Sequence, residues 1–559
     1  MSAAPELLRV PARWLAAVWS RPWIGFVAVF ACALWQRWHM PWLPLATADS
    51  WGFLAPVFHE MNGEGFRQTF GRSLAYPLFL LSILRITESF PAIAVVQYAL
   101  GLLSGVAWVW VFSLWVAWLP ASVRRRPFVW WIGAFALGLY LLGAWTVMHE
   151  TMLRPESIFP LFAFLQAGFT LVFLRARWNT FRPLTATLSG ALAVLCAALC
   201  LSLKPSWGFA AAVPAAALLA GLIGTGSPAI RLASVSAAVC GLALTGVWIK
   251  AVPPVTGWIA DDAGKTFLPA TLFTVHADLV SRTMHERARR GLLDEEEVDF
   301  LARLDLRLAE SRKIHPQKFK LLGHDPDYLM YQSDALRELP GDAHAAADRA
   351  ADYLMASYFT AVMDQPAATA AKVWKQLLQA FGNAENSLHC ASSSWRSHFE
   401  NARDLFPLYQ AAAVPARLTA GWDDMSRQCA SLAGAEPKRR FFAPSMPPWF
   451  LRGFLTALVG FLTVGGLLIV IVPERVLGNR PARELLPSAR VFSVIVAMHL
   501  GAVMTVAIVH SFDIKRYLAL LSPTQSLVLG AGSALLVALL LVVWPARQKL
   551  SATDPSSRL

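Results

Sequence analysis

The chain has 559 residues, of which 56% are hydrophobic and only 15% are charged, and its formal net charge is +13. Soluble domains carry about 25% charged residues, so this composition excludes an ordinary soluble protein and indicates a membrane protein. The arginines stand mostly in short gaps between apolar runs, where they act as topology signals, and this placement argues against nucleic-acid binding.

The opening segment leads into the first apolar run. It contains Arg9, Arg13 and Arg21 but no small-residue cleavage site after a short apolar core. A cleaved signal peptide needs such a site, so we interpret this segment as a cytoplasmic amphipathic lead-in.

Ten apolar segments are predicted to span the membrane, which takes about 20 apolar residues per helix. A further apolar run, 74–84, is too short to span and is expected to lie in the membrane or re-enter it. We therefore expect an all-α polytopic membrane protein. The predicted spans are 23–45, 91–118, 128–147, 157–174, 184–203, 208–224, 232–252, 448–472, 491–510 and 521–545.

Arginine and lysine residues concentrate in alternate gaps between these spans. If the spans simply alternate, all of these gaps face one side, which the positive-inside rule assigns to the cytoplasm. We therefore predict a protein of the bacterial inner membrane with both termini cytoplasmic. The extracytoplasmic face then holds residues 46–90, 148–156, 203–207, 253–447 and 510–520.

This topology divides the chain into three parts. Residues 1–252 form a predicted seven-span module, residues 253–447 an extracytoplasmic insert, and residues 448–559 a three-span module. The insert is polar, and it contains stretches with apolar residues at three- and four-residue spacing, which is typical of helices. We expect a mainly helical insert whose role the sequence does not assign.

Two of the six cysteines, Cys390 and Cys429, fall in the insert. The extracytoplasmic side of an inner membrane is oxidising, so these two are candidates for a disulfide. The alternative is two unrelated buried thiols. No C-x-x-C spacing indicates a zinc site.

The most informative polar residues lie in segment 46–90, directly after the first span. Asp49 stands at the mouth of that span, and Glu60 and Arg72 follow. Ionisable groups at the edge of hydrocarbon are costly and tend to be retained for function. Asp49 could instead cap a juxtamembrane helix, because Thr47-Ala48-Asp49-Ser50 is a good capping sequence.

The other outer loops add ionisable groups on the same face. Carboxylates can deprotonate a hydroxyl or hold a metal, whereas several cations together suit a phosphate, which arginine can bind bidentately. The combination at headgroup level fits chemistry on a lipid-linked phosphate. The residues are His149, Glu150, Arg154 and Glu156 in the second loop, Lys204 between the fifth and sixth spans, and His510, Asp513, Arg516 and Tyr517 in the last loop.

Several of these residues also have a structural interpretation. Glu150 could pair with Arg154, one helical turn away. Lys204 could be a snorkelling interfacial lysine. Arg516 could anchor the last two spans at the headgroups, and Tyr517 could belong to an aromatic belt.

The pattern resembles the GT-C superfamily of integral-membrane glycosyltransferases, which includes protein mannosyltransferases, aminoarabinose transferases and arabinofuranosyltransferases. The resemblance covers most of the spans, although the chain lacks the paired prolines and the common Asp-Glu doublet of that family. The matching motifs are Thr47-Ala48-Asp49-Ser50 for the acidic position after the first span, Gly71-Arg72-Ser73-Leu74-Ala75-Tyr76-Pro77 for the entry into the next apolar segment, His149 to Glu156 for the acidic second loop, and Asp513 to Tyr517 for the late Arg-Tyr motif.

This resemblance implies a GT-C-like bundle of about ten helices, with juxtamembrane helices in a catalytic first outer loop. It implies inverting transfer of a sugar from a polyprenyl-phosphate carrier to a hydroxyl of a glycan, lipid or protein, with Asp49 as the general base. Lys204 and Arg516 would hold the donor phosphate, and Arg72 and Arg154 are further candidates for that role.

The resemblance also suggests roles for the remaining polar residues. Glu150, with His149 and Glu60, would shape the acceptor site, or Glu150 would share a divalent cation such as Mg²⁺ or Mn²⁺ with Asp49. Tyr517 and Asp513 are further site candidates.

Two other functions remain open. An O-antigen ligase or polymerase that uses polyprenyl pyrophosphate would need a dense arginine set in the large outer loop. Arg282, Arg287, Arg289 and Arg290 could supply it, although acidic residues stand nearby. A transporter usually carries ionisable groups at mid-membrane, whereas here the span centres are almost free of charge.

Overall fold

The computed structural model describes the chain in ten segments. Helices make up almost all of the described part, in which the β-type pairing is an isolated bridge between Leu45 and Met152. The segments are 18–66, 73–223, 228–256, 267–336, 338–341, 347–382, 400–405, 413–434, 454–471 and 480–552.

Six helical stretches in the described residues are long and apolar enough to cross a membrane. A seventh is a pair of helices, α7 (Pro127–Leu141) and α8 (Ala144–Thr151), bent by 43°. The protein is thus an all-α polytopic membrane protein, as predicted. The six are α5 (Phe90–Val116), α9 (Phe159–Arg175) with its π-helical extension Ala176–Thr180, α10 (Pro183–Leu203), the stretch Pro205–Leu222 with α11 (Gly208–Ala211) and α12 (Val213–Ile223), α23 (Arg480–Val509) and α25 (Ser522–Ala552).

Each of the other three predicted spans also contains a helix, but these helices have shorter apolar stretches. They are α2 (Trp23–Trp38), α13 (Pro228–Thr256) and α22 (Thr456–Ile471). The count of ten spans therefore stays a prediction beyond the six or seven that length and composition support. The short apolar run predicted at 74–84 forms α4 (Ala75–Thr87), with 13 residues.

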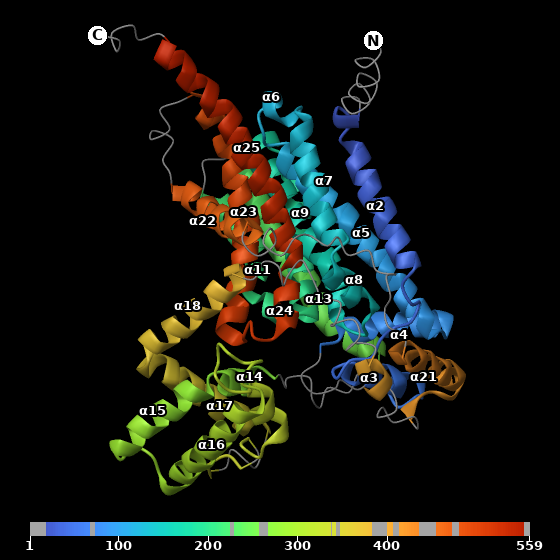
Figure 1. The fold of residues 1–559 in the computed structure, drawn as a ribbon, viewed down its shortest axis with the longest axis vertical. Helices are drawn as coiled ribbons and strands as arrows, with labels where there is room; N and C mark the ends of the chain where they lie inside the picture. The colour runs from blue at the N-terminus through green and yellow to red at the C-terminus, as the bar shows by residue number, and fades with distance from the viewer. Residues whose placement is uncertain are drawn as a thin grey trace, which may run out of the picture.

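The predicted connections between the spans lie in two groups at opposite ends of the bundle (Figure 1). The beginning of α2, the short helix α6 (Ala121–Arg124) and the end of α25 lie at one end. Helix α3 (Trp51–Met61), α24 (Lys515–Leu520) and the insert lie at the other, which we call the outer end. Alternating spans require this separation. The assignment of the outer end to the extracytoplasmic side rests on the positive-inside rule.

The predicted N-terminal and C-terminal modules pack into one bundle. Indole N–H groups of α5 donate to residues of the last spans, Trp108 to Ser526 Oγ at 3.0 Å and Trp115 to Ser488 O at 3.1 Å. One continuous apolar core includes residues of α5, α9, α23 and α25. Buried indoles need a hydrogen-bond partner, so these two pairs fix how the modules meet.

The insert has an apolar core of its own. Phe273, Phe300, Leu304 and Leu354 belong to it. Its last described helix instead docks on the membrane part, through Trp422 against the rings of Phe58 and Phe90. The helices of the insert are α14 (Leu268–Val275), α15 (Ala277–Arg289), α16 (Glu295–Ile314), α17 (Ala347–Asp364), α18 (Pro366–Gly382) and α21 (Thr419–Gly434).

The predicted disulfide falls partly outside the described residues. Cys390 lies outside the described residues, whereas Cys429 lies within them and is buried with a free thiol. The pairing of these two cysteines therefore stays a prediction.

Candidate functional site

The first and second outer loops are joined by main-chain hydrogen bonds. The Leu45 N–H donates to Thr151 O at 2.7 Å, and the Leu153 N–H donates back to Leu45 O at 3.0 Å. The Ser50 hydroxyl also donates to Leu153 O at 3.0 Å. These bonds place Asp49, next to Ser50, beside the chain that continues to Arg154.

Asp49 lies between two arginines from distant parts of the chain. Its Oδ2 accepts hydrogen bonds from Arg154 Nη2 and from Arg516 Nη1, the latter at 2.9 Å. The side chain of Asp49 is 22% exposed and that of Arg516 35% exposed, so this pair of residues lies where the site meets solvent. Ser50 occupies the N-cap position of α3 and makes no side-chain capping hydrogen bond.

A second carboxylate, Glu156, lies on the other side of Arg154. Lys204 Nζ lies 2.6 Å from Glu156 Oε1, and Arg154 Nε lies 3.7 Å from Glu156 Oε2. Arg154 has an extended backbone, and Lys204 is the residue that ends α10. Four chain segments thus converge on one group of ionisable side chains. We call this group the outer cluster; it comprises Asp49, Arg154, Glu156, Lys204 and Arg516.

The outer cluster contains three cationic side chains and two carboxylates. Two of its donors, the Nε–H groups of Arg154 and Arg516, are buried and have no hydrogen-bond partner in the structure, and the two carboxylate oxygens of Glu156 are buried without a hydrogen bond as well. A buried N–H without a partner costs free energy, and guanidinium groups bind phosphate and carboxylate groups through such donors. The surplus of positive charge and the unused donors are what an anionic ligand would satisfy.

Burial and charge oppose each other at the inner part of the cluster. Burial raises the pKa of Glu156, but Lys204 and Arg154 outweigh it and hold this pKa well below its ordinary value. Burial lowers the pKa of Lys204, which Glu156 opposes. We therefore describe Glu156 and Lys204 as an ionised pair that keeps Arg154 in place.

Arg516 is supported from behind by two stacked rings. Its guanidinium lies 5.3 Å from the centroid of the Tyr517 ring, a cation–π arrangement. The Tyr517 ring stacks on His510 at 4.4 Å, and the Tyr517 hydroxyl lies 3.2 Å from His510 Nδ1. Burial lowers the pKa of His510 to about 3, and nearby cations add to this effect. The imidazole ring is therefore neutral, and its Nδ1 can accept a hydrogen bond from the Tyr517 hydroxyl.

Helix α18 of the insert holds the loop that carries Arg516. The Gln376 side chain is fully buried; its Nε2 donates to Ser511 Oγ at 3.0 Å, and its Oε1 accepts from the Phe512 N–H at 2.8 Å. Lys372 Nζ lies within hydrogen-bond distance of His510 O, at 3.4 Å. The conformation of the last outer loop therefore depends on α18.

Asp513 is a structural residue in this arrangement. Its carboxylate accepts main-chain N–H groups from Leu321 and Leu322 of the insert, each at 3.1 Å from Oδ2, and the Ser511 hydroxyl at 3.0 Å. Asp513 thus ties the insert to the last outer loop and does not contact Asp49. Its predicted role as a site residue stays a prediction.

The insert also contributes charges at the rim of the outer cluster. Burial raises the pKa of Asp327, and the charges of Arg516 and Lys318 oppose this shift. The negative charge of Asp49 raises the pKa of the Asp327 carboxyl group further. Asp327 therefore lies within electrostatic reach of Arg516 and Asp49, which sequence reasoning did not predict.

The structure does not bring Glu150 to Asp49. Glu150 instead forms a bidentate ion pair with Arg37 of α2, at 2.7 Å to Arg37 Nε and 2.6 Å to Nη2, and both side chains are buried. Arg37 Nη1 also lies 3.3 Å from Leu141 O, where α7 ends at the bend. A Cβ at Gly101 would lie 2.1 Å from Glu150 Oε1, so this glycine makes room for the pair.

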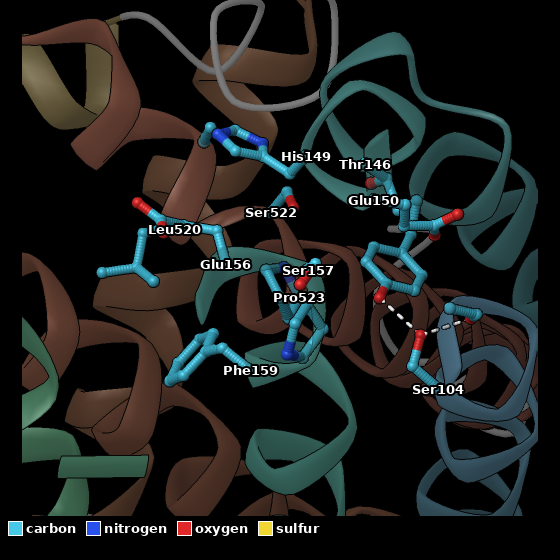
Figure 2. A pocket seen from close by; sticks show the side chains of 14 residues that line it. Ser104, Thr146, His149, Glu150, Glu156, Ser157, Phe159, Leu520, Ser522 and Pro523 are labelled. Atoms are coloured by element: carbon cyan, nitrogen blue, oxygen red, sulfur yellow. Dashed lines mark hydrogen bonds between the residues drawn. The ribbon is translucent and has the colours of Figure 1, made fainter. Parts of the chain in front are cut away.

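Glu150 and Glu156 line opposite sides of a small cavity, and their carboxylates point away from each other (Figure 2). The free space inside, about 20 Å³, suits about one water molecule and is too small for a sugar. His149 lines the same cavity, and its Nδ1 lies 2.8 Å from Trp145 O. Both the predicted role of Glu150 beside Asp49 and the alternative pair with Arg154 are thus corrected.

Two further predicted residues lie away from the outer cluster or outside the described part. Glu60 pairs with Arg85, whose side chain is 49% exposed. Arg72 lies outside the described residues. Glu60 is therefore not a member of the cluster.

The predicted sharing of a metal by Asp49 and Glu150 does not fit the structure. The described residues contain no group of three His, Cys, Asp or Glu side chains that could hold a metal ion. Asp49 and Glu150 each bind arginine and lie in separate pairs.

Comparisons with known proteins returned no match among family models, curated proteins or solved structures.

Proposed function

We propose that this protein is a GT-C-like glycosyltransferase that moves a sugar from a polyprenyl-phosphate carrier to an acceptor hydroxyl at the outer end of the bundle. The observation that carries the proposal is the outer cluster. Its three cations exceed its two carboxylates, and two buried arginine N–H groups lack a partner. A phosphodiester supplies the negative charge and the acceptor oxygens that this arrangement lacks.

The membrane setting supports a lipid-linked donor. Lys204 follows α10 directly, and His510 and Arg516 follow α23, so the cluster lies where apolar helices end. Outside the cytoplasm no nucleotide sugar is available, which leaves a carrier lipid as the source of an activated sugar. In this proposal the phosphate binds at the cluster and the prenyl chain lies along the apolar helices.

Asp49 is the proposed general base. It takes the proton of the acceptor hydroxyl while the hydroxyl oxygen attacks the anomeric carbon and the bond from that carbon to the phosphate oxygen breaks. The electron pair of that bond stays on the phosphate, which leaves as a monoester with one more negative charge. A single displacement of this kind inverts the anomeric carbon.

The charges of the cluster suit this step. When Asp49 accepts the proton, the cluster loses one negative charge, and its positive surplus rises as the phosphate becomes more negative. Arg516 and Arg154, both bound to Asp49 in the structure, are then the nearest donors for the leaving group. Charge that is fixed in place before the reaction stabilises a transition state without reorganisation.

The alternative ligase or polymerase gains no specific support from the insert arginines. Arg282 pairs with Asp278, and Arg289 and Arg290 pair with Glu286, all on the exposed surface of α15. These pairs are what helical residues three or four positions apart form. The outer cluster, not this surface, brings three partly buried cations together.

The direct test is a transfer assay with purified protein in vesicles and a panel of polyprenyl-phosphate sugars. We expect turnover of one donor by the natural protein and a loss of about 10²- to 10⁴-fold in Asp49→Asn, which is the range for removing a general base. Glu60→Gln, at another acid of the same loop, serves as the matched control and should retain activity. Turnover of no donor, or full turnover by Asp49→Asn, would reject the proposal, and uptake of a solute would replace it with transport.

A further inference from the structure

Helix α18 packs Val373, Leu377 and Ala380 toward the bundle, yet it also exposes large apolar side chains on its other side. Gln376 is fully buried, whereas Trp374 is 61% exposed and Leu378 is 55% exposed. A helix on the surface of a soluble domain keeps its apolar stripe against the core and a polar face outward. The outward face of α18, with two large apolar side chains exposed, departs from this arrangement.

The inward face is committed to the membrane helices. Gln376 binds the loop after α23 through Ser511 and Phe512, as described above. Lys372 Nζ lies 3.3 Å from Ala507 O, near the C-terminal end of α23, where the helix dipole stabilises a positive charge. These contacts fix the rotation of α18 about its axis, so its outward face is determined too.

The outward face has the composition of a helix at a membrane surface. Its exposed residues recur at three- and four-residue spacing and include one tryptophan and one lysine. Tryptophan is enriched at the membrane–water interface, and a lysine there can extend its ammonium group to water. The exposed residues are Pro366, Ala367, Ala370, Ala371, Trp374, Lys375 and Leu378.

This face is continuous with a membrane helix. Near the end of α18, Phe381 packs against an apolar cluster that includes Leu455 and Val459, and α18 lies directly beside the outer end of α22 (Figure 1). Helix α22 is itself apolar and exposes large side chains such as Phe461 and Val464. A lipid surface that covers α22 would extend without interruption to α18.

We propose that the outward face of α18 is embedded in the outer leaflet of the bilayer and anchors the insert to the membrane. Lipid is the occupant that accounts for the tryptophan, the single lysine and the continuity with α22 together. Because α18 also holds the loop of Arg516, the anchor sets the depth of the outer cluster relative to the headgroups. The proposal does not depend on sugar transfer.

The test places an environment-sensitive fluorescent amino acid at position 374 or 378 of the full chain, reconstituted in phosphatidylcholine vesicles. Position 306 on α16 is the matched control, because Leu306 is 56% exposed and belongs to the insert. Lipids with brominated chains quench a probe in the leaflet, and iodide quenches a probe in water. Both substituted side chains on α18 are exposed, so the probes are not expected to disturb packing.

We expect brominated lipids to quench probes at 374 and 378 at least about twofold more than the probe at 306, and iodide to show the reverse order. Equal quenching by iodide at all three positions would overturn the proposal, because α18 would then face water. Protection of 374 and 378 from both quenchers would also overturn it, because a protein surface would then cover the helix.

Discussion

Two ion-paired carboxylates lie near the outer end of the bundle, and they differ in what their partners leave unused. Glu150 and Arg37 form a buried, bidentate pair in which the arginine also reaches main-chain oxygens of Ala33 and Leu141. Asp49 shares two arginines in a cluster with surplus positive charge, unused N–H groups and partial exposure. The first arrangement is complete without a ligand, whereas the second is not.

This difference indicates that Asp49, and not Glu150, is the better candidate for a catalytic acid or base. A saturated, buried pair stabilises a bend between two helices, and its loss should affect folding. An unsaturated cluster at the surface contributes less to folding, and its loss should affect binding and turnover.

The largest effect on stability is expected for Glu150→Gln. This change leaves the Arg37 guanidinium buried without its counter-charge, which should cost about 3–5 kcal/mol of the free energy of unfolding. Denaturant unfolding of the protein in detergent measures it. The double variant Arg37→Leu with Glu150→Leu is the control and should recover most of the loss. A single variant as stable as the natural protein would show that the pair does not hold the bend.

A smaller effect is expected for Gln376→Leu, which removes the partner of the buried Phe512 N–H. An unsatisfied buried donor costs about 1–3 kcal/mol, and the loop that carries Arg516 should become less ordered. Donor KM should rise severalfold if the proposed transfer is correct. Gln379→Leu, one turn further along the same helix, is the control. An unchanged donor KM in Gln376→Leu would show that α18 of the insert does not influence donor binding at the outer cluster.

Acid should weaken the cluster through Glu156. Because the folded state holds the pKa of Glu156 well below its ordinary value, this group stabilises the protein at pH values above that ordinary value. The contribution disappears as the pH falls toward the lowered pKa. Thermal unfolding between pH 3 and about 6 should therefore show a smaller acid-induced decrease in Tm for Glu156→Gln than for the natural protein. An identical decrease in both would contradict the ionised Glu156–Lys204 pair.

The smallest effect on stability is expected for Asp49→Asn. Partly exposed ion pairs contribute about 0–1 kcal/mol, so the free energy of unfolding should change little although transfer is lost. The contrast with Glu150→Gln in the same unfolding assay is the informative result. A loss for Asp49→Asn as large as that for Glu150→Gln would make Asp49 a structural residue.

Much of the membrane architecture could be predicted, because long apolar runs form helices in lipid whatever their partners. Asp49, Arg154, Lys204 and Arg516 were predicted from charge at span ends, and the structure brings them together. Their proposed roles stay predictions. The number of spans was less certain, because α2 and α22 have only 16 residues each.

The errors have a common physical origin in long-range pairing. Choosing Glu156 over Glu150 required knowing where α8 ends, since Glu150 is still helical and points to Arg37, 113 residues away. The sequence does not show that the backbone at Arg154 is extended, and this extended backbone precedes the turn that carries Glu156. The contact between Gln376 and Phe512 spans 136 residues and has no local pattern that could indicate it.

The most direct test of the outer cluster is the affinity of the purified protein for a short prenyl phosphate, measured by calorimetry in detergent. The natural protein should bind it, and Arg516→Gln should bind it about 10- to 100-fold more weakly, the loss expected for one charge-assisted contact. Arg85→Gln, at an exposed arginine of the same face, should bind it unchanged. Equal affinity in all three proteins, or no binding by any, would contradict the claim that the cluster is a site for a lipid-linked phosphate.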